Sequence, residues 1–527
     1  MNATPLPRPA HRHAGHTAVR WGLVGLAAAL LLWTVLRMHL AGQPLWAVGV
    51  LSLGSLALYI YASRATLAWK YLFPGVAGML VFVAFPLVYT LQLGFTNYSS
   101  SNLLTEERAR AYLLDQTEAD ERQRLAFTLH RADAATGAAW VLALGPLEPG
   151  EPATATERYV SAPLPLQALA AGTAPPAPLA LQSGEAPRSE PLGLREVIAL
   201  RAALMPLQLQ LPDGRVLRYV GLREYGIVKP LWTAQPDGSL VQASTGEVFR
   251  ANPTTGFFET ATGERMQPGF RVGIGWANYA RMVLDAEFRG PFLAIFVWTV
   301  TFAALTVVFA GGLGLALAVL LNWEALSHRT LYRTLLFLPY AVPGFISILV
   351  FKGLFNQNFG EINAILHALF GIRPAWFADP FLAKVMLLIV NTWLGFPYFM
   401  VLCTGLIKAI PADLYEASAL AGAKPLTNFF RITVPLIIKP LTPLLISAFA
   451  FNFNNFVLIA LLTEGRPDFL SSKLPAGTTD ILVSYTYRIA FTDAGQNFGL
   501  AAAISTLIFI LVALMGWAQL KMTKQGT

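Results

Sequence analysis

Residues 409–435 read AIPADLYEASALAGAKPLTNFFRITVP and separate two strongly apolar stretches. Pro411 suits the first turn of a helix, and Asp413 places a negative charge near the positive end of the helix dipole. Gly422 is suited to end that helix as a C-terminal cap, and a second short helix is expected to end before Pro435. Three apolar residues of the first helix share one face at helical spacing: Leu414, Ala417 and Ala421. The stretch predicts a rigid two-helix knob that can transmit force to its flanking segments.

The segments around this knob are long and apolar enough to cross a membrane. The chain of 527 residues is 55% hydrophobic and only 13% charged, about half the charged fraction of soluble proteins. A membrane span needs about 20 largely apolar residues. The first of the predicted spans is short and lies near Arg20 and Arg37, so a signal-peptide core is its alternative interpretation. Eight spans are predicted, at 21–36, 44–62, 72–93, 291–321, 334–355, 385–407, 441–462 and 499–520.

The basic residues near the span ends predict the orientation of the chain. Lys and Arg concentrate on the cytoplasmic side of membrane proteins. If the N-terminus of this chain is cytoplasmic, the Lys and Arg residues near its span ends fall on the cytoplasmic side, with Arg37 and Lys352 as exceptions. The residues on that side are Arg8, Arg12, Arg20, Arg64, Lys70, Arg329, Arg333, Lys408, Lys424, Arg431, Lys439, Lys521 and Lys524. Both termini and the loop 408–439 are therefore expected in the cytoplasm, and 94–290 and 463–498 outside it.

The acidic residues mark a long insert between the third and fourth spans. No Asp or Glu precedes Glu106, and 21 of the 30 acidic residues lie between Glu106 and Glu287. We therefore expect an all-α polytopic membrane protein of about eight transmembrane helices, with a large β-rich extracytoplasmic domain inserted between helices 3 and 4. The expected divisions are 1–93 for the tail and first three helices, 94–290 for the insert, 291–520 for a membrane core of the five later helices and 521–527 for a cytoplasmic tail.

The insert itself carries both helical and β signals. Thr105–Leu129 is charged and predicts a helix, whereas Leu207–Leu211 alternates and leads through Asp213 and Gly214 into a returning strand over Arg215–Val220. Similar turns occur at 237–238 and 245–246. Ala162–Gly193 is rich in Ala, Pro and Leu and predicts a loosely ordered connection. The insert is either a passive spacer or, because a spacer needs no folded β module, a docking surface for a partner.

Composition and missing motifs exclude several classes of function. The net charge of +8 is segregated along the chain, which argues against nucleic acid as a partner. No phosphate-binding Gly-x-x-x-x-Gly-Lys-Ser/Thr motif occurs, so the energy for any transport must come from another subunit. Acidic residues inside spans, which ion-coupled carriers use, are absent. The single cysteine, Cys403, allows no intrachain disulfide. A receptor would need a sizeable cytoplasmic output domain, which the sequence does not show. A membrane-embedded enzyme would need paired carboxylates or a metal cluster at a membrane boundary, and the sequence shows neither of these.

Amide and aromatic side chains recur in three late spans. Buried amides in a bilayer must be paired, so hydrogen bonding between helices is one interpretation. The other is a site for a neutral sugar, because aromatic faces stack on pyranose rings and amides bond to hydroxyls. The absence of charge argues against amino acids, phosphate or metal ions. Residues at i, i+3, i+4 and i+7 of the span at 385–407 share one face: Asn391, Leu394, Gly395 and Tyr398. The others are Tyr340, Phe451, Asn452 and Asn455.

The cytoplasmic knob resembles the EAA loop of ABC-importer permeases. That pattern is Glu-Ala-Ala, three residues, Gly, nine residues, Ile, one residue and Leu-Pro. Here the spacing is intact and two positions are substituted, Ser418 and Val434. The residues that match or replace the pattern are Glu416, Ala417, Ser418, Gly422, Ile432, Val434 and Pro435. The resemblance implies that the loop docks in a groove of an ATP-hydrolysing subunit, with Glu416 facing a basic residue.

Longer runs resemble the larger permease subunits of maltose/maltodextrin importers. These runs are YAVP at 340–343, FISIL at 345–349, FKGLFNQ at 351–357, NTWLGFPY at 391–398, KPLTP at 439–443 and the stretch 449–459. The first three spans through 95–100 and the stretch 291–298 are similar as well. The likeness covers most of the chain and is poorest in the Ala/Pro-rich part of the insert.

This resemblance implies a sugar-binding set and a group of partners. Ala448 stands where the family has a serine, with Ser447 before it, so one polar sugar contact is in question. The implied sugar-contacting residues are Tyr340, Asn391, Trp393, Leu394, Gly395, Tyr398, Phe451, Asn452 and Asn455. The implied partners are a MalG-like second permease, two copies of a MalK-like ATPase, a periplasmic maltose-binding protein that docks on the insert, maltose or maltodextrin, and the lipid bilayer of the bacterial inner membrane. No cofactor is expected on this chain, since ATP and Mg are used by the ATPase.

Overall fold

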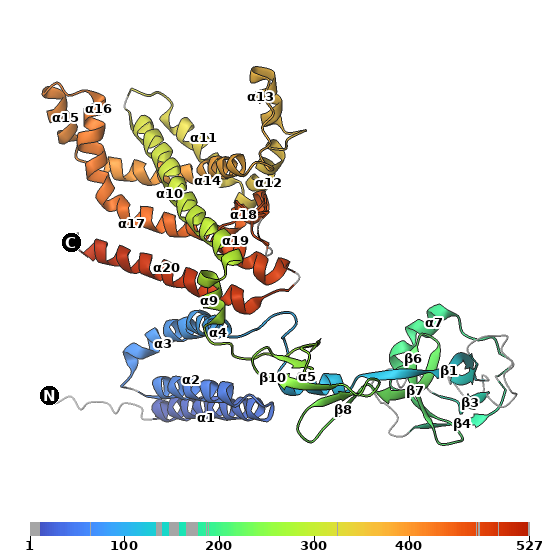
Figure 1. The fold of residues 1–527 in the computed structure, drawn as a ribbon. Coiled ribbons are helices and arrows are strands. Elements are labelled where there is room, and N and C mark those ends of the chain that lie inside the picture. Colours follow the sequence, from blue (N-terminus) through green and yellow to red (C-terminus); the bar gives the residue numbers. More distant parts are fainter. Residues whose placement is uncertain are drawn as a thin grey trace, which may run out of the picture. The chain divides into compact units, whose positions relative to one another are not determined.

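The chain folds into a helical unit and a β-rich unit. The computed structural model describes residues 11–524 apart from 64, 133–139, 147–157, 165–177, 186, 188, 324, 471, 473–474 and 494. The helical unit comprises Met1–Thr96 with Gly275–Thr527, and the β-rich unit is Asn97–Ile274 (Figure 1). The expectations for 1–10 and 525–527 as parts of the tails lie outside the described residues. Residues 94–96 and 275–290, expected in the insert, belong to the helical unit.

The first three predicted spans form helices. Helix α1 (His11–Leu40) and helix α2 (Pro44–Ala62) pack against each other. The third span is helical from Leu67 to Leu93. It consists of α3 (Leu67–Met79), a π turn (Leu80–Ala84) and α4 (Phe85–Leu93). Most side chains of these helices are exposed and apolar in the isolated chain, as lipid-facing residues are.

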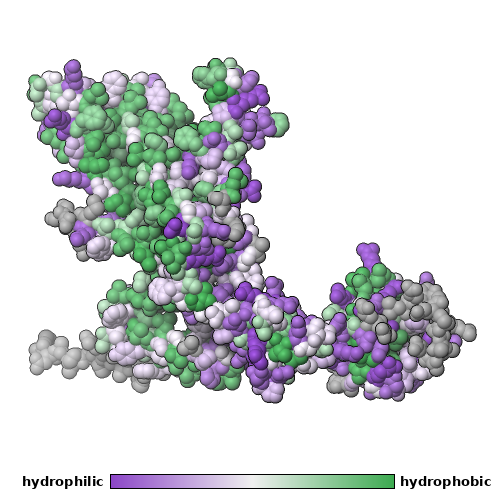
Figure 2. All heavy atoms as spheres, in the orientation of Figure 1, coloured by the Kyte–Doolittle hydropathy of each residue, from purple (hydrophilic) through white to green (hydrophobic). Residues whose placement is uncertain are grey.

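Long apolar helices form the core of the helical unit. They are α10 (Ala286–Asn322), α14 (Pro380–Lys408), α17 (Val434–Phe453) and α20 (Phe498–Lys524). Gly314 permits the close approach of α10 to α14, because a Cβ there would lie 2.5 Å from the Cβ of Phe399. Figure 2 shows hydrophobic residues spread over the surface of these helices and hydrophilic residues more frequent on the β-rich unit. This distribution is typical of helices surrounded by lipid.

The span predicted over 334–355 is helical but sharply bent. Helix α11 (Arg329–Ala341) and helix α12 (Gly344–Leu354) meet at a bend of 90°. Pro343 lacks an N–H and restricts the residue before it to an extended conformation, which Val342 adopts with φ −94° and ψ 130°. Among the described residues, six helices are long and apolar enough to span, or up to seven with this bent pair, and Trp46–Ala62 is a shorter apolar helix.

The span predicted at 441–462 begins earlier and is broken. Helix α16 (Pro425–Asn428), a π turn (Phe429–Thr433) and α17 form one helical stretch, which ends at Phe453. The chain then turns at Asn454 and continues as α18 (Phe456–Leu462). The expected second knob helix therefore does not end before Pro435. It continues through this proline, which follows directly on the π turn, where the backbone hydrogen-bonding pattern changes from five to four residues.

Shorter helices complete the helical unit. They are α9 (Ala277–Leu284), α13 (Glu361–Phe370), α15 (Ala412–Leu420) and α19 (Leu482–Tyr487), the last followed by a π turn over Arg488–Thr492. A buried ion pair fixes the segment between α18 and α20. Asp480 is fully buried and accepts from Arg488 Nη1 at 2.7 Å and from Ser484 Oγ at 2.8 Å. Arg488 also pairs with Asp468 at 2.6 Å.

The β-rich unit contains a closed barrel and a five-stranded sheet. The barrel is formed in order by β1 (Thr117–Arg131), β2 (Trp140–Gly145), β3 (Tyr159–Ser161), β4 (Leu179–Ser183), β5 (Gln208–Gln210), β6 (Val216–Gly221) and β7 (Glu224–Pro230). The sheet contains β8 (Trp232–Ala234), β9 (Leu240–Gln242), β10 (Val248–Asn252), β11 (Phe257–Glu259) and β12 (Arg265–Met266). Two short helices, α7 (Leu194–Ala199) and α8 (Arg201–Leu204), accompany the barrel. The β-rich extracytoplasmic domain between early and later helices is thereby confirmed.

Local predictions within this unit have mixed outcomes. The hairpin is confirmed, since β5 pairs with β6 and Gly214 adopts the left-handed φ of +89° in the turn. The helix expected over Thr105–Leu129 is wrong beyond α5 (Glu106–Leu114), because the rest pairs with β2 and β7 as a long strand. In the expected loose connection, Leu179–Ser183 is a strand, whereas 165–177 lie outside the described residues.

Candidate functional site

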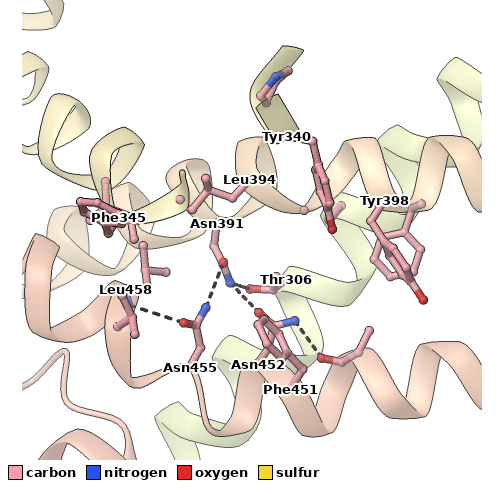
Figure 3. A pocket seen from close by; sticks show the side chains of 18 of the residues that line it. Thr306, Tyr340, Phe345, Asn391, Leu394, Tyr398, Phe451, Asn452, Asn455 and Leu458 are labelled. Atoms are coloured by element: carbon pink, nitrogen blue, oxygen red, sulfur yellow. Dashed lines mark hydrogen bonds between the residues drawn. The ribbon is translucent and has the colours of Figure 1, made fainter. Parts of the chain in front are cut away.

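The helical unit contains an open cavity of about 650 Å³. Its walls come from α10, from the bend between α11 and α12, and from α14, α17 and α18 (Figure 3). The bend contributes because the 90° turn exposes side chains from both of its helices to the same space. The lining residues predicted from the sequence are Tyr340, Asn391, Leu394, Gly395, Tyr398, Phe451, Asn452 and Asn455. Eight of the nine expected sugar-contacting residues therefore meet in one place.

Three asparagines form a hydrogen-bonded cluster on one wall. Asn391 Nδ2 donates to Asn452 Oδ1 at 2.8 Å and to Thr306 Oγ1 at 3.0 Å. Asn455 Nδ2 donates in turn to Asn391 Oδ1 at 3.2 Å (Figure 3). These bonds join α10, α14, α17 and the start of α18. They satisfy the buried amides as an apolar surrounding requires.

The cluster leaves hydrogen-bonding capacity on two of its members. Asn391, only 5% exposed, uses both amide hydrogens and accepts one bond, so its main effect is to hold the others in place. Asn452 Nδ2 donates one hydrogen to Ala448 O, and Asn455 Nδ2 donates one to Asn391. An amide carries two donors. Asn452 and Asn455 can therefore each offer a second N–H to a hydroxyl in the cavity.

Aromatic rings supply the other walls. Phe451 is 71% exposed, Tyr340 52% and Tyr398 39% although they lie in apolar helices, because these rings face the cavity rather than the helix packing. Figure 3 shows the rings of Tyr340 and Tyr398 on the same side of the cluster. Accessible ring faces beside amide donors are the chemistry that binds a neutral polyhydroxylated ring. Charged side chains are absent among the described residues that line this cavity.

Trp393 departs from the expected set. It lies two positions from Asn391, which turns it to another face of α14. There its ring packs edge-on against Phe351 with centroids 5.0 Å apart, and it borders a separate apolar hollow with Leu338 and Pro339. Gly395 lines the cavity and also serves helix packing. A Cβ at Gly395 would lie 3.2 Å from Ala310 Cβ, so this glycine allows α14 to approach α10.

Several lining residues lie outside the implied sugar-contacting set, although the sequence places Ala448, with Ser447 before it, at the position of a family serine. Thr306 is one of three threonines in α10, so the sequence does not single it out, and the apolar lining residues carry no distinguishing signal either. Ser447 and Ala448 both border the cavity, and Ser447 Oγ donates to Pro443 O and accepts from Gln519 Nε2. The additional lining residues are Thr306, Ala310, Pro339, Val342, Pro343, Gly344, Phe345, Ile348, Phe399, Ser447, Ala448, Val457 and Leu458.

The loop predicted to couple to an ATPase forms a compact knob at the beginning of α17 (Figure 1). Glu416 and Ala417 are exposed on α15, and Ser418 is half-buried. Gly422 adopts the left-handed φ of +76° expected of a C-terminal cap. Ile432 lies in the π turn and Pro435 in the first turn of α17. The apolar face of α15 is exposed and thus available to a partner.

Comparisons with known proteins agree over nearly the full length. Residues 104–275 match the family described as the maltose transport system permease protein MalF P2 domain, and residues 310–524 match the binding-protein-dependent transport system inner membrane component. The maltose/maltodextrin transport system permease protein MalF of Yersinia pestis is 48% identical over 517 residues, 97% of this chain and 95% of its own length. MalF of Escherichia coli K12 is 49% identical over 515 residues, 96% and 97% of the two chains. A chain of a bacterial alginate ABC transporter is 20% identical, with a TM-score of 0.42 over 48% of this chain and 83% of its own length.

Proposed function

The chain belongs to the MalF family of maltose/maltodextrin transport permeases, and from this membership we propose that its amide-lined cavity binds maltose and maltodextrins. It is a permease subunit of an ABC importer and a multi-pass protein of the inner membrane. ATP hydrolysis lies in separate subunits, so the chain is a transport component rather than an enzyme. Such a permease works with a second permease, an ATPase and a binding protein.

The observation that supports the site is the meeting of amide donors and open ring faces in one uncharged cavity. A pyranose offers apolar C–H faces and hydroxyls at its rim. Phe451 and Tyr398 have accessible faces for the former, and Asn452 and Asn455 have spare donors for the latter. Trp393 is not one of the proposed sugar contacts. Its ring packs against Phe351 outside the cavity.

Alternating access is the proposed mechanism. A periplasmic maltose-binding protein delivers the sugar to a cavity shared with a MalG-like permease, docking on the β-rich insert. Two MalK-like subunits bind ATP and its Mg²⁺ and displace the knob that carries Glu416. Movement of the knob changes the side to which the cavity opens. In this proposal both termini and the knob lie in the cytoplasm, as the distribution of Lys and Arg predicts.

The decisive experiment is uptake of labelled maltose into vesicles that contain the reconstituted complex, with and without binding protein and ATP. Phe451→Ala and Tyr398→Ala are expected to reduce uptake at least tenfold while the complex still assembles. Phe381→Ala is the matched control, because this exposed phenylalanine of α14 lies outside the cavity. Uptake that is unchanged in both cavity variants would contradict the site, and maltose uptake driven by an ion gradient without ATP would contradict the mechanism.

A further inference from the structure

Helix α15 has only two residues that turn away from solvent. Tyr415 and Ser418 are half-buried, and the other seven residues of the helix are exposed. The two lie three positions apart and hence on one face. That face points toward the beginning of the helix that contains α16, the π turn and α17. The opposite face, with Glu416 and Ala417, stays open.

Both inward residues form side-chain hydrogen bonds to that helix. Tyr415 Oη and Thr433 Oγ1 are 2.9 Å apart, and Ser418 Oγ donates to Asn428 Oδ1 at 2.6 Å. Thr433 is buried, and its hydroxyl also lies 3.4 Å from Asn428 O. None of the residues in α15 is buried, so apolar packing contributes little to its attachment. The two hydrogen bonds are therefore the specific ties between α15 and the rest of the chain.

The π turn explains why one helix face can supply both partners. Asn428 and Thr433 are five residues apart, a spacing that an α-helix places on different sides. In the π turn the Val434 N–H bonds to Phe429 O, five residues back, and the extra residue per turn brings positions five apart toward one face. A π turn within a helix often marks a functional position. Here it aligns the side chains of Asn428 and Thr433 with α15.

The same helix continues to the sugar cavity. The helical stretch runs from Pro425 to Phe453 over 29 residues, which corresponds to about 43 Å at 1.5 Å per residue. Phe451 and Asn452 lie at its far end and line the cavity. A rigid connection between α15 and this helix therefore links the knob mechanically to the cavity wall, with the Asn391–Asn452 bond as the next contact.

We propose that Tyr415 and Ser418 are positioning residues that lock α15 to Asn428 and Thr433, so that displacement of the knob moves the cavity wall instead of turning about Gly422. The inference rests on the proposed function, since it assumes that an ATPase displaces α15. Without the ties, Ala421–Lys424, with its left-handed glycine, is the pivot. ATP hydrolysis then continues, but the displacement of α15 is only partly passed on to the cavity wall.

The test is the amount of maltose transported per ATP hydrolysed by the reconstituted complex with binding protein. Thr433→Val removes the hydroxyl at nearly constant shape and is expected to lower this ratio at least threefold, with ATPase activity retained. Tyr415→Phe should have the same effect, and the double variant should be no worse than either single variant, because one bond is lost in each case. Thr433→Ser keeps the hydroxyl and should keep the ratio. Thr427→Val is the matched control on the exposed face of α16.

An unchanged ratio in both Thr433→Val and Tyr415→Phe would overturn the inference, as would an equal loss in Thr433→Ser. If the complex with Thr433→Val does not assemble, Tyr415→Phe still tests the inference. This variant removes only one oxygen from a half-buried ring, so the complex is expected to assemble. Failure of the proposed function is distinguishable, since it shows in the unaltered chain as absent maltose uptake. Failure of the inference shows only as variants that couple as well as the unaltered chain.

Discussion

Asn391 in α14 donates its side-chain amide to Oδ1 of Asn452 in α17 over 2.8 Å, and both residues are buried. The bond joins two helices that are separated by the whole knob in the sequence. Because Asn391 also binds Thr306 and Asn455, it fixes the relative positions of the helices that form the cavity. The side chains of Asn452 and Asn455 are thereby held at defined positions in the cavity wall.

Replacing the centre of this cluster should loosen the helix core. Asn391→Leu removes three side-chain bonds, each worth about 0.6 kcal/mol between membrane helices, or about 2 kcal/mol together. We expect a lower midpoint of thermal unfolding in detergent and at least tenfold lower maltose uptake. Asn454→Leu, at an exposed asparagine two residues beyond Asn452, is the control and should change the midpoint little. An Asn391→Leu protein with normal uptake would show that the cluster is dispensable.

Trp393 is expected to affect packing rather than sugar binding. Trp393→Ala removes the edge contact with Phe351 and should lower stability by about 1–3 kcal/mol. The maltose concentration for half-maximal uptake should stay the same, because the ring lies outside the cavity. Tyr398→Ala, measured in parallel, should raise that concentration. A raised concentration in Trp393→Ala as well would place the indole in contact with sugar.

Glu416 should act in coupling because it is exposed on the open face of α15. Glu416→Lys reverses the charge offered to a basic groove and is expected to reduce ATP-driven uptake at least tenfold. The amount of ATPase subunit that co-purifies with the permease should fall, or the stimulation of ATP hydrolysis by sugar-loaded binding protein should be lost. Glu416→Gln, which keeps the shape, should be milder. Full transport by the lysine variant would remove Glu416 from the coupling surface.

The buried ion pair between α18 and α20 should be far more important for stability than the exposed one nearby. Asp480→Asn leaves Arg488 buried with one counter-charge fewer, which typically costs about 3–5 kcal/mol. Glu464→Gln breaks a bridge to Lys352 between exposed side chains and should cost less than about 1 kcal/mol. Thermal unfolding of the two variants measures the difference. Equal midpoints would mean that the Arg488–Asp468 contact suffices.

Ala448 offers a gain of function. It borders the cavity, and Asn452 donates to its carbonyl oxygen. Ala448→Ser adds a hydroxyl that can bond to a sugar, worth about 0.5–1.5 kcal/mol, which corresponds to about a 2- to 10-fold lower maltose concentration at half-maximal uptake. Ala460→Ser in α18 is a control outside the cavity. No change in Ala448→Ser would place the sugar away from this wall.

The sequence alone determined the parts of this protein that depend on short-range patterns. Apolar length located the spans, alternation around Asp213 and Gly214 located a hairpin, and fixed spacing from Glu416 to Pro435 located the knob. Amide and aromatic residues on late spans indicated the chemistry of the cavity. Each of these signals is confined to a few turns of chain, so the tertiary contacts were not needed to detect it.

The tertiary structure decided which of these pieces meet and which elements continue. Only packing between distant helices showed that Asn391 bonds to Asn452 and that Trp393 faces away. The π turn carries one helix through Pro435, and β pairing turned the charged segment after Leu114 into a strand. The physical reason is that pairing, rotation and continuity depend on neighbours far away in the chain, where local hydropathy and spacing contain no information.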